Sequence, residues 1–230
     1  NATVDTNSSV GGVLLKSDFT GSITQAAGQS LTIGTSGWTQ SAGTFNGGSS
    51  PVSLNNSTFT LSGGSYNATS DETVFAGNST SNFNGGTFNH SNGTWRFATV
   101  QSGSSSNVTY SVAMTGASVT FYNLIAEGRS DTGWAKYQLS VPTTKSIVVA
   151  GTFTIGGSGA MGMGCLIGGG NIELKGNLVA QNSTCSNSDN VGNLIFNGTG
   201  AQTYTFPSGA GFQIPAGSGD KATLPAIEIN

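Results

Sequence analysis

The residues of this sequence that could carry out chemistry are few and widely spaced. One histidine, ten acids and seven bases are spread over 230 residues. A nucleophilic triad around His90 would need an acid and a Ser or Cys beside it, and its place directly after Gly86-Thr-Phe-Asn89 indicates a turn instead. Asp71 and Glu72 form the only adjacent acid pair. Such pairs can bind calcium or cleave glycosidic bonds, but the sequence shows no gathering of further acids with a base. We therefore predict no enzymatic activity, no cofactor and no metal site.

Two short motifs imitate catalytic or binding signatures. Asp131-Thr-Gly133 matches the aspartic-protease triplet, whose chemistry needs two carboxylates that share a proton, and the sequence holds one copy. Gly157-Ser-Gly-Ala-Met-Gly162 matches the dinucleotide fingerprint, which works only where a helix begins. The chain instead continues into Cys165-Leu-Ile-Gly-Gly-Gly170. We interpret the first motif as non-catalytic and the second as a tight turn.

Cys165 and Cys185 are the only cysteines, and they are too few to build a four-ligand metal site with one distant histidine. Two alternatives remain: a pair of buried thiols, or a disulfide, which an oxidising exterior permits. A disulfide over a loop of this size would stabilise the fold by about 3 kcal/mol on the chain-entropy model. We predict the disulfide.

Sequons for N-glycosylation also point to the cell exterior. Their number is roughly twice what the content of Asn, Ser and Thr would produce by chance. The alternative is that Asn residues favoured in turns generate sequons without any glycan. The eleven candidate sites are Asn1, Asn7, Asn55, Asn56, Asn67, Asn78, Asn89, Asn92, Asn107, Asn182 and Asn197.

Low charge excludes several classes of partner. Asp, Glu, Lys and Arg make up 7% of the chain, against roughly 25% in an ordinary globular domain. The net charge is −3 and no basic cluster is present, so we expect no nucleic-acid binding. The sequence contains no run of eighteen apolar residues, so we expect no membrane insertion. No charged segment followed by an apolar one opens the chain, so Asn1 either follows a removed signal or lies within a longer protein.

Short apolar–polar alternations bounded by Gly, Asn and Ser predict an all-β fold. Gly43-Thr-Phe-Asn46 recurs forty-three residues later as Gly86-Thr-Phe-Asn89, and repetition on this scale is typical of solenoids. We predict a single parallel β-helix (β-solenoid) over residues 1–230, with short strands and Gly/Asn-rich turns. Coils of roughly 20–25 residues would place the two cysteines on adjacent coils. The alternative is an antiparallel β-sandwich fibre subunit that donates residues 1–15 to a neighbour.

Three strings resemble the degenerate repeats of secreted bacterial surface proteins of adhesin-like type. They are Gly85-Gly-Thr-Phe-Asn89, Phe121-Tyr-Asn-Leu-Ile125 and Ile195-Phe-Asn-Gly-Thr-Gly-Ala-Gln-Thr203. The resemblance covers about residues 84–125 and 190–230. It implies an exported β-helical stalk or passenger, and it supplies no catalytic residues.

Residues 127–146 break the repeat pattern and predict a protruding loop or a soft boundary. Within them, Arg129, Trp134 and Tyr137 are candidates for contact with a glycan or a partner; the alternative is that the two aromatic residues cap the edge of a coil. The leading functional expectation is an extracellular, cell-surface structural protein whose copies join end to end as a fibre, stalk or adhesin. The alternatives are a strand-donating pilus-like subunit and a β-helix that binds or cleaves polysaccharide.

Overall fold

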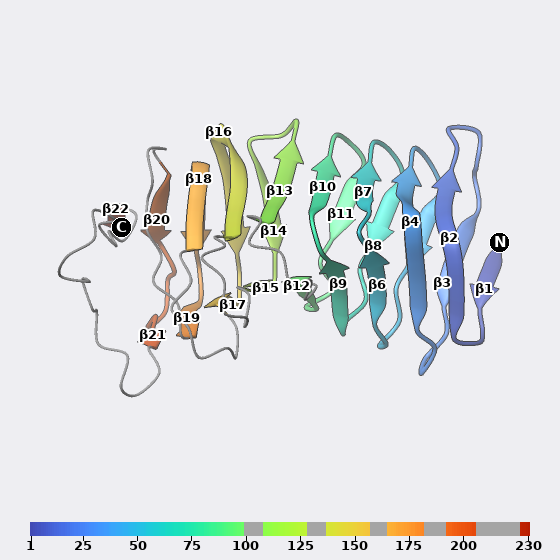
Figure 1. The fold of residues 1–230 in the computed structure, drawn as a ribbon, viewed down its shortest axis with the longest axis horizontal. Helices are drawn as coiled ribbons and strands as arrows, with labels where there is room; N and C mark the ends of the chain where they lie inside the picture. The colour runs from blue at the N-terminus through green and yellow to red at the C-terminus, as the bar shows by residue number, and fades with distance from the viewer. Residues whose placement is uncertain (99–107, 128–136, 157–164, 182–191, 206–225) are drawn as a thin grey trace.

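The structure is a computed structural model that describes residues 1–98, 108–127, 137–156, 165–181, 192–205 and 226–230. In these ranges the chain forms strands and no helix, so none of them contains a helix that could span a membrane. The strands stack as a parallel β-solenoid of about seven turns, side by side along the long axis with the termini at opposite ends (Figure 1). The predicted all-β class and β-solenoid are confirmed.

Most strands are short because each crosses one face of a coil before the chain turns. In chain order they are β1 Ala2–Val4, β2 Ser8–Leu15, β3 Ser22–Gln25, β4 Leu31–Gln40, β5 Thr44–Asn46, β6 Val52–Asn55, β7 Thr58–Leu61, β8 Ser65–Asn67, β9 Glu72–Ala76, β10 Ser79–Phe83, β11 Thr87–Asn89, β12 Thr94–Ala98, β13 Val108–Met114, β14 Ser118–Phe121, β15 Asn123–Ala126, β16 Tyr137–Val149, β17 Thr152–Gly156, β18 Cys165–Leu174, β19 Asn177–Gln181, β20 Asn193–Phe196, β21 Tyr204–Thr205 and β22 Ala226–Ile229.

The antiparallel sandwich, our alternative for the fold, is wrong. Every strand pair among the described residues is parallel. The segment 1–15, expected there to leave the subunit, instead forms β1 and β2, which pair with β3 and β4 of the same chain. Parallel neighbours need a crossover between them, and each coil of the solenoid supplies it.

From β3 to β12, one coil takes 21 or 22 residues, whereas the step from β2 to β4 takes 23 to 25. In the five-stranded sheet β1-β3-β5-β8-β11, Ser22 pairs with Thr44, Thr44 with Ser65, and Ser65 with Thr87. The two copies of Gly-Thr-Phe-Asn are therefore two coils apart. Gly64-Ser-Tyr-Asn67 is the copy between them.

Inward-facing side chains form columns that run along the solenoid. One column joins Ile33, Leu54, Phe75 and Phe97 through the register of β4, β6, β9 and β12, and all four are fully buried. Fully burying such a side chain contributes about 1.5–3 kcal/mol relative to exposure. The period-two alternation read from the sequence corresponds to these columns, because neighbouring residues of a strand face the core and the solvent in turn.

The five-stranded sheet ends at β11, which pairs with β8 and with no other described strand. On the next coil β14 occupies the position that corresponds to β11. Among the described residues β14 pairs only with β16 and not with β11. The core nevertheless continues across this break, since Phe88 and Phe121 lie with ring centroids 5.6 Å apart. The hydrogen-bonded ladder is thus interrupted on one side of the solenoid between β11 and β14.

Three glutamine side chains, of which Gln25 and Gln40 are buried, hold the turns together. The Gln40 amide donates to the carbonyl oxygens of Gly43 and Ser65, at 3.2 and 3.0 Å, and its oxygen accepts from the Trp38 indole at 3.3 Å. Gln25 and Gln202 likewise donate to several backbone carbonyls and accept from a backbone N–H. Each amide adds hydrogen bonds to backbone groups at the turns; some of these, such as the Gly43 carbonyl oxygen, also accept a backbone N–H from the next coil.

The expected loop or boundary at 127–146 falls partly on residues 128–136, outside the described ranges. Residues 137–149 form β16, which pairs with β13, β14 and β18 and so continues the stack. The register shifts between Val141 and Ser146, where β16 passes from one face of the coil to the next.

Candidate functional site

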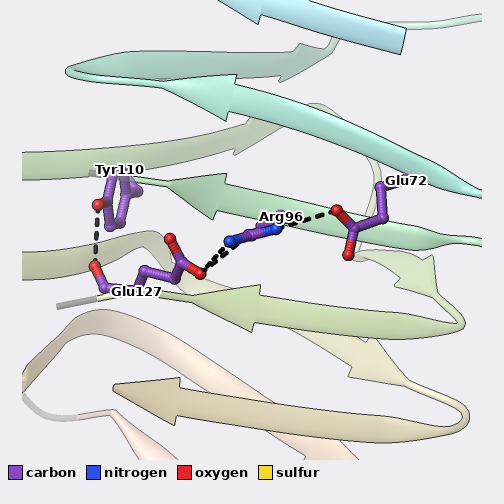
Figure 2. A network of polar contacts seen from close by, with 4 residues as sticks. All are labelled: Glu72, Arg96, Tyr110 and Glu127. Atoms are coloured by element: carbon purple, nitrogen blue, oxygen red, sulfur yellow. Dashed lines mark hydrogen bonds and ion pairs between the residues drawn. The ribbon is translucent and has the colours of Figure 1, made fainter. Parts of the chain in front are cut away.

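Three charged side chains meet on the outer face across successive strands β9, β12 and β15 (Figure 2). Arg96 Nη1 donates to Glu72 Oε2 at 3.0 Å, and Arg96 Nε donates to Glu127 Oε1 at 2.9 Å. In the backbone register Arg96 lies opposite Val74 of β9 and Ile125 of β15, and Glu127 directly follows β15. Alternation directs Arg96 outward while Trp95 and Phe97 point into the core. We refer to Glu72, Arg96 and Glu127 as the charged cluster.

Electrostatics favour the ionised arginine in this cluster. Partial burial opposes the charge, but the hydrogen bonds and negative charges of Glu127 and Glu72 outweigh burial and raise the pKa of Arg96 above its ordinary value. The Tyr110 hydroxyl donates to the backbone oxygen of Glu127 at 2.9 Å (Figure 2). Burial, with a contribution from the Glu127 charge, raises the pKa of Tyr110, so this hydroxyl keeps its proton.

The cluster corrects our expectation that no base or further acid gathers around Asp71 and Glu72. Residues 24 and 31 positions apart meet here because each lies on a neighbouring coil. One guanidinium binds both carboxylates, so the cluster joins three neighbouring coils through ion pairs. We expected no enzymatic activity from the sequence, and that expectation stays a prediction.

Replacing Arg96 by Gln should lower the free energy of unfolding by about 1 kcal/mol at low salt, because a partly exposed ion-pair network contributes modestly. The loss should shrink in 1 M salt, where charges are screened over about 3 Å. Denaturant unfolding of both proteins at the two salt concentrations measures this. An equal loss at both would show that Arg96 acts through packing of its aliphatic chain.

Seven of the predicted sequon asparagines have exposed side chains, and occupancy of all eleven stays a prediction. Asn107 and Asn182 lie outside the described residues, and Asn67 and Asn197 are partly buried. The exposed ones are Asn1, Asn7, Asn55, Asn56, Asn78, Asn89 and Asn92.

Several asparagines act as bridges between coils. The side-chain oxygens of Asn1, Asn7 and Asn78 accept the backbone N–H of Ser22, Ser30 and Thr109, respectively, at 2.8–3.2 Å. The same bond is made by three asparagines that begin no sequon, namely Asn123, Asn171 and Asn177. A structural demand for Asn at these positions therefore accounts for part of the excess of sequons.

Asn67 is the poorest of the described candidates for a glycan. Its amide nitrogen donates to Asn46 Oδ1 at 2.9 Å, and Thr69 of its sequon is buried with its hydroxyl bound to the carbonyl oxygens of Gly48 and Ser50. A glycan on Asn67 would have to displace the hydrogen bond from Asn67 to Asn46.

Other predicted site residues lie outside the described part of the chain. These are Cys185, Arg129, Trp134, the Asp131-Thr-Gly133 triplet and the segment 157–162. For Tyr137 and Cys165 the backbone alone is described, at the paired starts of β16 and β18. The disulfide and the contact site at 129–137 therefore stay predictions.

His90 lies in the predicted turn, between β11 and β12. Its Nδ1 accepts the backbone N–H of Asn92 at 3.0 Å, and its ring stacks on Tyr122 of the next coil at a centroid distance of 5.6 Å. Burial lowers the pKa of His90 below its ordinary value. The neutral ring is therefore favoured in the folded protein, with its proton on Nε2.

His90 should make stability fall as the pH drops below about 6.5, the ordinary pKa of histidine. The unfolded chain takes up a proton there before the folded chain does, so protonation favours unfolding until the folded pKa is passed. Because His90 is the only histidine, His90→Gln, which keeps an acceptor, is a clean comparison. The thermal midpoint of the unmodified protein should fall more between pH 7.5 and 5.5 than that of the variant; equal falls would contradict this role.

The described residues contain no group of three or more His, Cys, Asp or Glu side chains placed to hold a metal ion. Comparison with protein-family models, curated proteins and solved structures found no match to this chain.

Proposed function

We propose that this chain is an extracellular structural protein, a segment of a surface fibre or stalk in which copies stack head to tail. The observation that carries the proposal is the position of exposed apolar side chains. Four large ones are exposed among the described residues: Val10, Leu14, Tyr122 and Ile229. Three of these four lie in β2 and β22, at the two ends of the stack (Figure 1).

Val10 and Ile229 are the end members of inward-facing columns. Val10 pairs with the fully buried Ile33 and is itself 38% exposed, and Ile229 pairs with Phe196 and is 80% exposed. Another coil stacked on either end, from a second copy or from a continuation of the same protein, would bury them. Among described strands, β2 pairs only with β4 and β22 only with β20, and an unpaired strand is a template for pairing with another chain.

The two ends present different surfaces, so contact between copies would be head to tail. Such a heterologous contact does not close on itself unless it is bent into a ring, and it propagates as a filament. The outer faces suit an exterior location: charge is low, hydroxyl and amide side chains are plentiful, and seven sequon asparagines are exposed. Glycans on these asparagines would add solubility that the missing charges do not supply.

Electron microscopy of the purified chain tests the proposal. We expect unbranched filaments one solenoid wide that lengthen as the protein concentration rises. A uniform population of single particles at all concentrations would contradict it.

A further inference from the structure

Among the residues that the structure describes, Tyr122 is the one exposed large apolar side chain that does not lie at an end of the stack. It lies between β14 and β15, on the side where the ladder is interrupted, and it is 36% exposed. Stacking of further coils would not cover it. A separate reason is needed for an aromatic ring at this place.

The Tyr122 ring is held in one orientation. The His90 ring stacks on it from the preceding coil, with an angle of 28° between the ring planes. On the following coil, Gly151 lies so close that a Cβ there would be 3.3 Å from Tyr122 Cε1. A ring held in this way is a preformed stacking platform, which lowers the entropic cost of binding a ligand.

A crevice opens beside this platform, at the break between β11 and β14. The space inside it is about 10 Å³, which holds one water-sized group. It therefore admits a single hydroxyl of a ligand whose body lies outside. Its lining residues carry no charged side chain: they are Ala68, Thr69, Phe88, His90, Gly93, Thr94, Trp95, Phe121, Tyr122 and Asn123.

One hydrogen-bond donor of the lining is available to a ligand. His90 uses Nδ1 to accept the N–H of Asn92, which leaves Nε2–H to donate. The Trp95 indole also lines the crevice, but its Nε1 is closed off from solvent and offers no donor there.

We propose that this site binds a neutral sugar, with one face of the sugar ring stacked on Tyr122 and one hydroxyl in the crevice, where it accepts from His90 Nε2–H. Sugars combine an apolar face of C–H groups, which packs on aromatic rings, with hydroxyls that accept hydrogen bonds. The absence of Lys and Arg from the lining argues against an anionic ligand. The site goes beyond the proposed fibre and does not depend on assembly of copies.

Saturation-transfer difference NMR on the full chain tests this binding, because it reports on ligand protons whether the protein is monomeric or assembled. The probes are glucose, galactose, mannose and N-acetylglucosamine and their β-1,4-linked tetramers, with glucuronic acid as the charged comparison. We expect at least one neutral probe to bind and glucuronic acid to bind more weakly.

Three variants test the site. Tyr122→Ala should weaken binding at least tenfold, Tyr122→Phe should stay within about threefold because the stacking face is kept, and Thr120→Ala, an exposed neighbour in β14 outside the crevice, should leave binding unchanged. Circular dichroism confirms that each variant is folded. The proposal is overturned if no neutral probe binds, if folded Tyr122→Ala binds as the unmodified chain does, or if glucuronic acid binds best.

Discussion

Replacing Gly64 by Ala should lower the free energy of unfolding by about 3 kcal/mol or more, a large part of the 5–15 kcal/mol typical of a folded domain. Gly64 has a φ of +72°, and a Cβ on it would lie 2.3 Å from the carbonyl oxygen of Gly43 on the preceding coil. Left-handed backbone costs an L-residue about 1–2 kcal/mol. The clash adds to this cost, because neighbouring coils are held at strand spacing, about 4.8 Å.

Gly28→Ala separates the two causes. Gly28 has a φ of +76°, but a Cβ there would meet nothing within 4 Å. We therefore expect a loss of only about 1–2 kcal/mol from its backbone conformation. Denaturant unfolding of both variants measures the difference. Equal losses would show that the coils can separate at Gly64 without cost.

Replacing Gln40 by Met should cost about 3 kcal/mol, although Met fills nearly the same space. The change leaves the Trp38 indole N–H without its partner and removes the hydrogen bonds to the Gly43 and Ser65 carbonyl oxygens, although Gly43 O still accepts the backbone N–H of Ser65. A buried polar group left without its partner costs about 1–3 kcal/mol, and Gln40 is fully buried. Unfolding followed by tryptophan fluorescence measures the loss.

Leu61→Met is the matched control for this prediction. Leu61 is the register neighbour of Gln40 on the next coil and is buried. The exchange of Leu for Met conserves volume and should cost less than about 1.5 kcal/mol. If Gln40→Met costs no more than the control, the turn groups are satisfied without the glutamine.

The sequence predicts the coil architecture because the signal is local. Alternation within four or five residues specifies which side chains face the core, as in Val52-Ser-Leu54 of β6, and Gly and Asn mark the turns. The period of 21–22 residues is harder to detect. The aromatic residue of the repeated Gly-Thr-Phe-Asn motif is Phe45 in one coil and Phe88 two coils later, but it is Tyr66 in the coil between them. A search for identical residues therefore finds only every second coil.

Contacts between coils could not be predicted in the same way. Arg96 meets Glu72 and Glu127 at separations of 24 and 31 residues, and such unequal spacings cannot be read without the register. In the sequence nothing distinguishes Gln40 from an exposed polar residue, because its burial depends on the turn at Gly43 and on Ser65 of the next coil. From the sequence we expected the leading sugar or partner site at 129–137 and interpreted His90 as a turn residue alone, because its contact with Tyr122 forms only when consecutive coils stack.

Mixing two end-blocked variants tests head-to-tail stacking most directly. Val10→Lys and Ile229→Lys each place a charge on one end of the core, and Thr39→Lys, on the outer face of β4, is the control. Sedimentation velocity should show the unmodified chain and the control as long assemblies, each end-blocked variant as a monomer, and their equimolar mixture as a dimer. A monomeric unmodified chain at tens of micromolar, or a mixture that stays monomeric while the unmodified chain assembles, would contradict the account.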